Sequence, residues 1–377
     1  MTEFRIPTRI VYGQGSAALL GSIGGQRLLL VYDNSGVADM AMEQLSLSPI
    51  TVRRFKADNR YTCEAAVKEG AKALMEFKPD WILAAGGHGA MDLAKLIRIF
   101  YQRPEFSMDD VLNGRAADIE ISKTRLITLP LLNTNGGEAA CTAHLADIVM
   151  GYESEVRCFG LIPDIAIIDP GTLIYSSERD EAQSVLSTLV LAIEASLDES
   201  TASFVRPMAL EAMRIIFQSV LAHFSAPSQR HPLLYAQCLA GIAYSNSSAG
   251  LSSTLARATA LTFGTVSFGE LAAVYLPSVI RLDKEQSRYL PAAEAMGLND
   301  GASLASVVEE YADMLGLPLS LKEMGTARNA FLKKLSKIAH RVLSTASTGV
   351  LPEKEPQKTI EQILRSAYSP QEQQSTP

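Results

Sequence analysis

Short apolar runs alternate with amphipathic stretches through the first 170 residues, and this alternation constrains the fold more than any other feature. Strands of a parallel sheet are apolar on both faces, because helices cover the sheet from both sides. The stretch 63–77 is apolar at helical spacing and connects two such runs, as in a βαβ unit. The pattern predicts an α/β domain with a parallel, Rossmann-like sheet. Its predicted strands span residues 9–13, 27–33, 50–55, 81–87, 125–130 and 165–170.

Beyond Ser177 the strand-like runs nearly vanish and long Ala/Leu-rich segments replace them. Such segments predict helices, so we expect an α/β domain over residues 1–176 and an all-α domain over residues 177–377. The short boundary favours a tight cleft between the two. The predicted helices span residues 184–197, 208–224, 233–244, 303–314 and 326–344.

The last segments of the chain allow two interpretations. Residues 352–358 have the composition of a charged linker, and residues 359–368 form a short amphipathic pattern. This pattern predicts either the closing helix of the domain or a detachable peptide that docks on a partner shell. Residues 369–377 are predicted to be disordered.

Charge and cysteine usage exclude several classes of protein. Lys and Arg number 34 and Asp and Glu 41, for a net charge of −7, and no dense basic tract occurs. A nucleic-acid partner is therefore not expected. No apolar run approaches the roughly 18 residues of a membrane span, so no membrane partner is expected either. The 4 cysteines are scattered, without the spacing of a zinc or redox motif. We expect a cytoplasmic protein.

A glycine-rich turn between a buried strand and a helix is the first candidate for ligand binding. Gly86, Gly87, His88 and Gly89 end the strand, and Asp92 follows early in the helix. Helix N-termini attract phosphate, and glycine lets backbone N–H groups approach a dinucleotide. The alternative is a purely structural role, because any strand-to-helix turn of an α/β fold needs glycine.

A second candidate is Asp33, at the carboxyl end of an earlier predicted strand. An acidic residue there can accept a hydrogen bond from the adenosine ribose of a dinucleotide. The alternative is that its carboxylate caps a helix N-terminus.

Taken together, motifs along nearly the whole chain resemble the iron-containing alcohol dehydrogenase family. The segment 8–20 is most similar to the propanol dehydrogenases that serve propanediol microcompartments. The resemblance implies an N-terminal dinucleotide-binding domain, a helical C-terminal domain, and NAD and a divalent metal between them. It also implies a place inside a bacterial microcompartment. The motifs occupy residues 12–16, 86–95, 129–138, 162–170, 191–195, 239–245 and 268–281.

The resemblance also implies where one aspartate and three histidines should hold the metal. Counted from Asp169, the aspartate position is Ser187 and the first histidine position is Leu191. The second histidine position falls at Ser253, and the last falls at Ser267 or Phe268, depending on a one-residue insertion. Hydroxyl, isobutyl and phenyl groups do not hold a divalent metal unaided. We therefore expect this chain to be a divergent member of the family that binds no metal there.

The cofactor positions implied by the resemblance have also changed. His88 replaces the third glycine of the family turn, where it either obstructs a nucleotide or donates to its phosphate. Leu131 and Leu132 replace two threonines, which we expect to remove hydroxyl donors from the opposite wall of the site. NAD(H) is therefore expected to bind weakly. The candidate cofactor residues are Asp33, Gly86, Gly87, His88, Gly89, Asp92, Asn135 and Gly136.

Two functions remain open on the residues. One is a non-catalytic homologue that forms a homo-oligomer and binds or regulates an active paralogue or a microcompartment protein. The other is an NAD(H)-dependent oxidoreductase that interconverts a short alcohol and its aldehyde without the metal, using protein donors instead. His144, in a strand-like segment, is interpreted as a structural histidine rather than a general base. The candidate catalytic residues are Ser187, Tyr244, Ser253 and Arg257.

Overall fold

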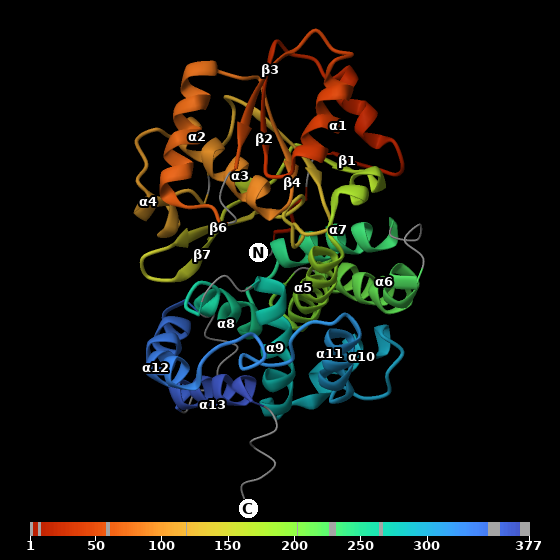
Figure 1. Cartoon of the computed structure of the whole chain (residues 1–377), viewed down its shortest axis with the longest axis vertical. Coiled ribbons are helices and arrows are strands. Elements are labelled where there is room, and N and C mark those ends of the chain that lie inside the picture. Colours follow the sequence, from red (N-terminus) through yellow and green to blue (C-terminus); the bar gives the residue numbers. More distant parts are fainter. Residues whose placement is uncertain are drawn as a thin grey trace, which may run out of the picture.

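The N-terminal part of the chain is a six-stranded parallel sheet with helices on both faces, as predicted (Figure 1). The computed structural model describes residues 3–6, 9–57, 61–117, 119–201, 203–225, 231–263, 267–345 and 355–369. The strand order is β1-β8-β5-β4-β2-β3, and every described pairing in this sheet is parallel. The strands are β1 (Arg9–Tyr12), β2 (Arg27–Tyr32), β3 (Thr51–Lys56), β4 (Trp81–Gly86), β5 (Arg125–Pro130) and β8 (Ile165–Ile168).

Burial along the strands follows their place in the sheet. β4 is buried at every residue and β2 and β5 nearly so, as the apolar runs predict. The edge strands β1 and β3 are largely exposed instead, and two arginines interrupt the apolar pattern of β3. Helices α2 (Glu64–Phe77) and α3 (His88–Gln102) pack on one face, whereas α1 (Ser35–Leu45) packs on the other. The short α4 (Met108–Leu112) follows α3.

An antiparallel hairpin, which the apolar pattern did not predict, lies where the two halves of the molecule meet (Figure 1). Its strands are β6 (Thr142–Asp147) and β7 (Tyr152–Arg157). β6 contacts α3 in the N-terminal domain, and β7 contacts α8 in the helical domain. The hairpin therefore connects the two domains at one side of the cleft.

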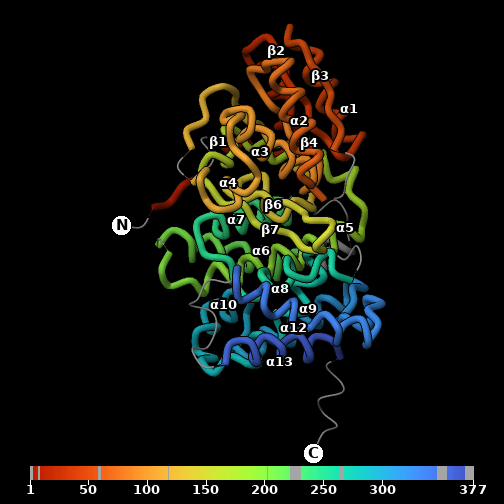
Figure 2. Tube along the Cα trace, turned by 90° about the vertical axis from the view of Figure 1, so that its left-hand side faces the viewer, coloured from red at the N-terminus to blue at the C-terminus, as the bar shows by residue number. Residues whose placement is uncertain are grey.

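Within the described residues, every regular element after β8 is helical, as predicted. The helices form a layer beside the sheet domain, with α12 and α13 farthest from it (Figure 2). α5 is buried along most of its length because α6, α7 and α9 surround it. α8, α9 and α10 were not predicted. The helices are α5 (Glu178–Leu197), α6 (Val205–Ser225), α7 (His231–Ser245), α8 (Leu251–Thr259), α9 (Phe268–Leu282), α10 (Leu290–Ala295), α11 (Ser303–Met314), α12 (Arg328–Thr345) and α13 (Pro356–Tyr368).

The C-terminal amphipathic pattern forms α13, which closes the helical domain. Ile360, Ile363 and Leu364 are buried, and the ring of Tyr368 stacks on Phe331 of α12 with 4.7 Å between centroids. Of the two interpretations, the structure shows the closing helix. The charged segment before it and the predicted disordered tail lie largely outside the described residues. None of the described helices is long and apolar enough to cross a membrane.

Candidate functional site

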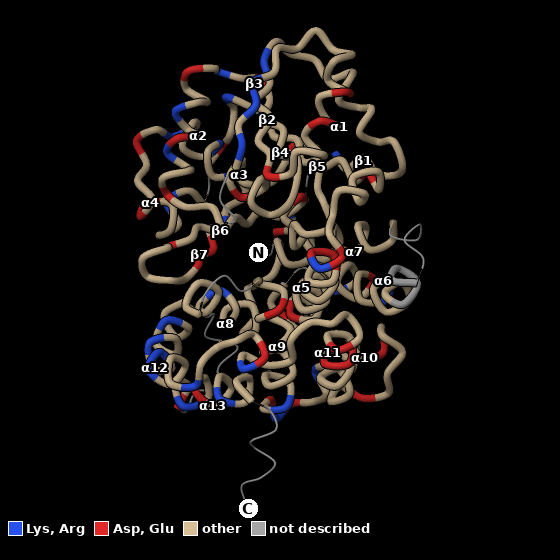
Figure 3. The backbone as a smooth tube through the Cα atoms, viewed as in Figure 1, with Lys and Arg blue, Asp and Glu red and all other residues tan. Residues whose placement is uncertain are grey.

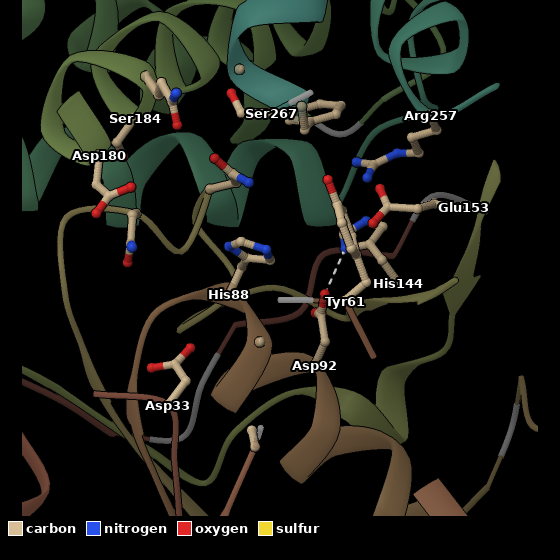
Figure 4. Close-up of a pocket in the computed structure, with 17 residues that line it drawn as sticks. Asp33, Tyr61, His88, Asp92, His144, Glu153, Asp180, Ser184, Arg257 and Ser267 are labelled. Carbon is tan, nitrogen blue, oxygen red and sulfur yellow. Dashed lines mark hydrogen bonds and ion pairs between the residues drawn. The ribbon is translucent and has the colours of Figure 1, made fainter. Parts of the chain in front are cut away.

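A pocket of about 280 Å³ lies between the two domains (Figure 4). This volume is just below the roughly 300–1,000 Å³ that small-molecule sites occupy. The sheet domain contributes Asp33, His88 and His144 to its wall, and the helical domain contributes Arg257 and Phe268. In the view of Figure 4, Asp33 and His88 lie toward one end, and His144 and Arg257 toward the other.

At the first end, the carboxylate of Asp33 occupies the N-terminus of α3. It accepts hydrogen bonds from the backbone N–H groups of Gly87 (2.9 Å) and Ala90 (3.1 Å). Gly86 has a φ of 137°, and a Cβ there would collide with the Asp33 carboxylate. The helix-capping alternative is therefore what the structure shows for Asp33. The backbone turn that suits a diphosphate is present, but a nucleotide must compete with this carboxylate for the amides.

The other candidate cofactor residues are in three environments. His88, Gly89 and Asn135 line the pocket. Gly136, with a φ of 76°, packs directly on the backbone of Gly241, so it shapes the loop rather than a ligand surface. Asp92 lines the pocket but is paired with His144.

The sequence analysis placed Leu131 and Leu132 on the wall of the site, and this placement is wrong. Their side chains are packed into the apolar cores and neither lines the pocket. Both leucine side chains point into the protein interior. From this loop, Asn133 and Asn135 line the pocket instead.

The first two positions that the resemblance assigns to metal ligands lie on α5 and are fully buried. The Ser187 hydroxyl donates to Asn135 Oδ1 at 2.6 Å and contacts the backbone oxygen of Ser184 at 3.0 Å. Leu191 belongs to the apolar core of the helical domain. Neither residue lines the pocket, so Ser187 is not placed to act on a pocket ligand as a catalytic donor.

The other two positions lie at α8 and α9. Ser253 is fully buried, and its hydroxyl donates to the carboxylate of Glu194, which also accepts the N–H groups of Ser252 and Ser253. Glu194 thus caps α8, and the candidate role of Ser253 as a catalytic donor is not supported by its position. Phe268 lines the pocket and lies under the guanidinium of Arg257, 4.4 Å from the ring centroid.

This set of side chains does not fit a divalent metal. The four positions supply no carboxylate or imidazole ligand. They hold two hydroxyls that already form hydrogen bonds within the protein, an isobutyl group and a phenyl ring. Among the described residues, no group of three or more His, Cys, Asp or Glu side chains gathers in a way that could hold a metal ion.

The second end of the pocket is built around His144, whose environment the sequence analysis missed. His144 Nδ1 lies 3.0 Å from Asp92 Oδ2, the contact drawn as a dashed line in Figure 4. On the hairpin, His144 lies directly opposite Glu155 in the register of β6 and β7. Nε2 is 3.6 Å from Glu155 Oε2, too far for a hydrogen bond. The imidazole therefore stands between two carboxylates.

Glu155 in turn connects the two domains. Its carboxylate accepts from Arg157 on the same strand (2.8 Å) and from the hydroxyl of Tyr244 on α7 (2.7 Å), and Arg257 Nη2 on α8 lies 3.3 Å away. Arg157 also donates to three backbone oxygens at the end of α7 and just beyond it, those of Tyr244, Ser245 and Ser247. Of the candidate catalytic residues, Arg257 lines the pocket, whereas Tyr244 is buried behind it.

The charges of this network fix most of its protonation states. Burial alone would raise the pKa of Asp92, but the attraction and hydrogen bond of His144 outweigh burial and lower it. Burial also opposes ionisation of Glu155, yet Arg157, His144 and Arg257 hold its pKa well below the usual range. Burial and Arg257 depress the pKa of His144, whereas Asp92 and Glu155 raise it, and the net shift is upward.

One signal in the sequence could have located this network. In the segment 152–157, Glu153, Glu155 and Arg157 alternate with other residues, and strand periodicity puts all three on one face. A charged face on a strand between two domains predicts partners across the cleft. His144 lies in the preceding strand, so a hairpin prediction would have brought it beside Glu155.

Comparison with known proteins agrees with this architecture. The profile described as "Iron-containing alcohol dehydrogenase" matches residues 7–170, and "Fe-containing alcohol dehydrogenase family, C-terminal" matches residues 181–368. Each of the two domains thus matches one profile, and both profiles describe the same family. The chain belongs to the iron-containing alcohol dehydrogenase family.

Similar proteins cover nearly the whole chain. The NADPH-dependent butanol dehydrogenase of Clostridium saccharobutylicum is 28% identical and 98% of each chain is covered. The iron-containing alcohol dehydrogenase structure from Thermococcus thioreducens superposes with a TM-score of 0.85, at 25% identity over 97% of this chain and 99% of that one. A sulfoacetaldehyde reductase from Bifidobacterium kashiwanohense, solved in complex with NAD+, shares the fold with a TM-score of 0.83 at 18% identity, covering 98% and 99%.

Proposed function

We propose that this family member no longer performs metal-dependent alcohol dehydrogenation. The observation that carries the proposal is the state of the four inferred ligand positions. They hold two serines whose hydroxyls are bonded within the protein, a core leucine, and a phenylalanine stacked on an arginine. Without a carboxylate or an imidazole beside them, these groups do not hold a divalent cation.

The energetic consequence is large. A metal lowers the pKa of a bound alcohol and stabilises the alkoxide from which hydride leaves, an effect worth several kcal/mol. Each ~1.4 kcal/mol corresponds to a factor of ten in rate. Alcohol oxidation by the metal route is therefore impaired by several orders of magnitude.

One role left to such a chain is non-catalytic. It would keep the fold, form a homo-oligomer, and bind or regulate an active paralogue or a microcompartment protein in the cytoplasm or inside a bacterial microcompartment. The contacts of Glu155 with Tyr244 and Arg257 support this role, because they join the hairpin to the helical domain.

The second candidate is an NAD(H)- or NADPH-dependent oxidoreductase that works without the metal on a short alcohol and its aldehyde. A specific observation favours it, namely that the pocket persists and contains a histidine paired with an aspartate. The turn before α3 would hold the nucleotide diphosphate, and the nucleotide would supply or accept the hydride. Because Asp33 occupies two amides of that turn, binding of the nucleotide is expected to be weak.

Elemental analysis and turnover test the proposal together. We expect less than one equivalent of iron or zinc per chain after purification, and no increase in C2 to C4 alcohol oxidation when Fe²⁺ or Zn²⁺ is added. The combined variant S187D/L191H/S253H/F268H should gain metal more readily than activity. A stoichiometric metal in the wild-type protein that disappears in Ser187→Ala or Ser253→Ala would refute the proposal.

A further inference from the structure

The helix α12 differs in charge from the chain as a whole. It carries five Lys and Arg residues and no Asp or Glu, in a chain whose net charge is −7. Figure 3 shows basic residues gathered on this helix at the outer side of the helical domain. Its apolar residues, among them Phe331 and Leu335, are buried against the domain, so its lysines are turned toward solvent. α12 therefore presents a basic face.

The three lysines of this face have no ion-pair partner within the described part of the chain. Lys333, Lys334 and Lys337 are all exposed. Glu355, which caps the neighbouring helix α13, is paired with Lys358 of that helix instead. Lysines that are not neutralised within the protein attract an anionic partner.

Beside the basic face lies the turn of the β6–β7 hairpin, and the tip of this turn is apolar. Ile148, Val149 and Met150 follow one another there, with exposed fractions of 61%, 94% and 48%. Turns usually carry Gly, Asn, Asp, Ser or Pro, so local conformation does not account for three apolar side chains in a row. An exposed apolar patch beside polar residues marks a surface that contacts a protein or a membrane.

Arg341 of α12 holds the turn against the helix. Its guanidinium donates to the backbone oxygens of Ala258 (2.8 Å) and Met150 (3.2 Å) and lies 4.0 Å from the ring centroid of Tyr152. Within the turn, Asp147 Oδ1 accepts from the N–H of Met150 at 2.8 Å. These contacts fix the backbone of the turn and leave its apolar side chains outside. The tip and the lysines therefore lie on the same side of the molecule (Figure 3).

We propose that residues 148–150 and the basic face of α12 together bind an anionic lipid bilayer. At such a surface, apolar side chains enter the boundary of the acyl chains and lysines meet anionic headgroups. The Val149 side chain protrudes, which suits a lipid surface because lipids adapt to its shape. A contact of this kind needs no membrane-spanning run, and such a run is all that the apolar pattern excludes. Lipid binding here does not involve the cleft and is independent of the proposed loss of metal chemistry.

The two parts of this surface should respond differently to salt. Each lysine near an anionic membrane strengthens binding about fivefold, and salt screens this effect. Burial of the apolar tip contributes a part that salt does not screen. The net charge of −7 repels other faces of the molecule from an anionic bilayer, so the protein should bind in one orientation.

The first experiment measures co-sedimentation of the full chain with vesicles of phosphatidylcholine alone or of phosphatidylcholine and phosphatidylserine (about 3:1). Wild-type protein should bind the anionic vesicles at least about tenfold more strongly than the neutral ones at about 0.1 M salt. The variant K333Q/K334Q/K337Q should lose at least about tenfold of this affinity, because three positive charges are removed. Lys72→Gln, at an exposed lysine of α2, is the matched control and should bind like the wild type.

The second experiment tests whether the tip enters the lipid. Val149→Ser should weaken binding about fivefold and remove most of the binding that remains at about 1 M salt. Leu47→Ser, at a side chain 74% exposed in the sheet domain, is the matched control and should have no effect. In Val149→Trp, brominated lipids should quench the added fluorescence. Leu47→Trp should show no more quenching than the wild type, whose single tryptophan is Trp81.

Three results would overturn the inference. The first is wild-type binding that does not differ between neutral and anionic vesicles. The second is wild-type affinity in K333Q/K334Q/K337Q, or an equal loss in Lys72→Gln. The third is no quenching in Val149→Trp. Binding of the wild type to poly-L-glutamate but not to vesicles would assign the surface to an acidic protein partner instead. None of these results changes the metal content, which elemental analysis tests separately.

Discussion

Two regions beside the cleft, the inferred metal positions and the hairpin, differ in how they satisfy their polar groups. At the inferred metal positions, the Ser187 hydroxyl donates to Asn135 of the N-terminal domain, the Ser253 hydroxyl donates to Glu194 within the helical domain, and the remaining positions are apolar. At the hairpin, Glu155 accepts hydrogen bonds from both domains, and His144 stands between the carboxylates of Asp92 and Glu155. Ser187, Leu191 and Ser253 are therefore part of the protein interior. The hairpin carries the charge that a ligand site needs.

This difference predicts where mutations cost most. Breaking a buried ion pair by removing one partner leaves the other charge without compensation, whereas deleting a neutral hydrogen bond removes a smaller contribution. Stability should therefore depend strongly on the hairpin network and weakly on the former metal positions.

The largest effect is expected for Glu155→Ala, at about 3–5 kcal/mol of unfolding free energy, because it leaves Arg157 and Arg257 without their common carboxylate. Urea unfolding followed by the fluorescence of Trp81, the single tryptophan, measures it. Glu153→Ala, two residues away on the same strand, is the matched control and should cost much less. Equal losses in the two variants would contradict the distinct role of Glu155.

The sequence predicted most of the architecture because apolar periodicity determines it. The α/β pattern to residue 170 and the helical pattern after residue 177 reflect burial, which a run such as Trp81–Gly86 displays directly. α8 and α9 were missed because serine, arginine and a proline interrupt their apolar faces, and tertiary packing stabilises them instead.

The candidate site was harder to predict, since it depends on contacts between distant residues. The substitutions at the inferred metal positions could be found by counting from Asp169. The network around His144 joins residues from positions 92, 144, 155, 244 and 257, and no local spacing connects them. The strand-like segment around His144 indicates a structural histidine, and nothing in the sequence shows that Asp92 reaches it.

A second, intermediate effect concerns the nucleotide end of the pocket. Asp33→Asn removes the negative charge from the N-terminus of α3 and weakens its hold on the amides of Gly87 and Ala90. Affinity for ADP should then rise about tenfold, or about 1.4 kcal/mol, since the diphosphate no longer competes with a carboxylate. Calorimetry measures the change, with Asp39→Asn on the exposed face of α1 as the control. A loss of affinity would show instead that Asp33 binds the ribose.

The smallest effect is expected for Ser187→Ala, which removes one neutral hydroxyl from an inferred metal position. Its hydrogen bond to Asn135 Oδ1 is worth about 1 kcal/mol net, and that oxygen lies beside the pocket, where water can replace the lost donor. Unfolding free energy should fall by about 1 kcal/mol, without any change in metal content. The loss should be a third or less of that in Glu155→Ala when both are measured in the same buffer. A loss as large as that of Glu155→Ala would mean that Ser187 supports more than a loop contact. The inferred metal positions and the hairpin network would then contribute equally to the free energy of unfolding.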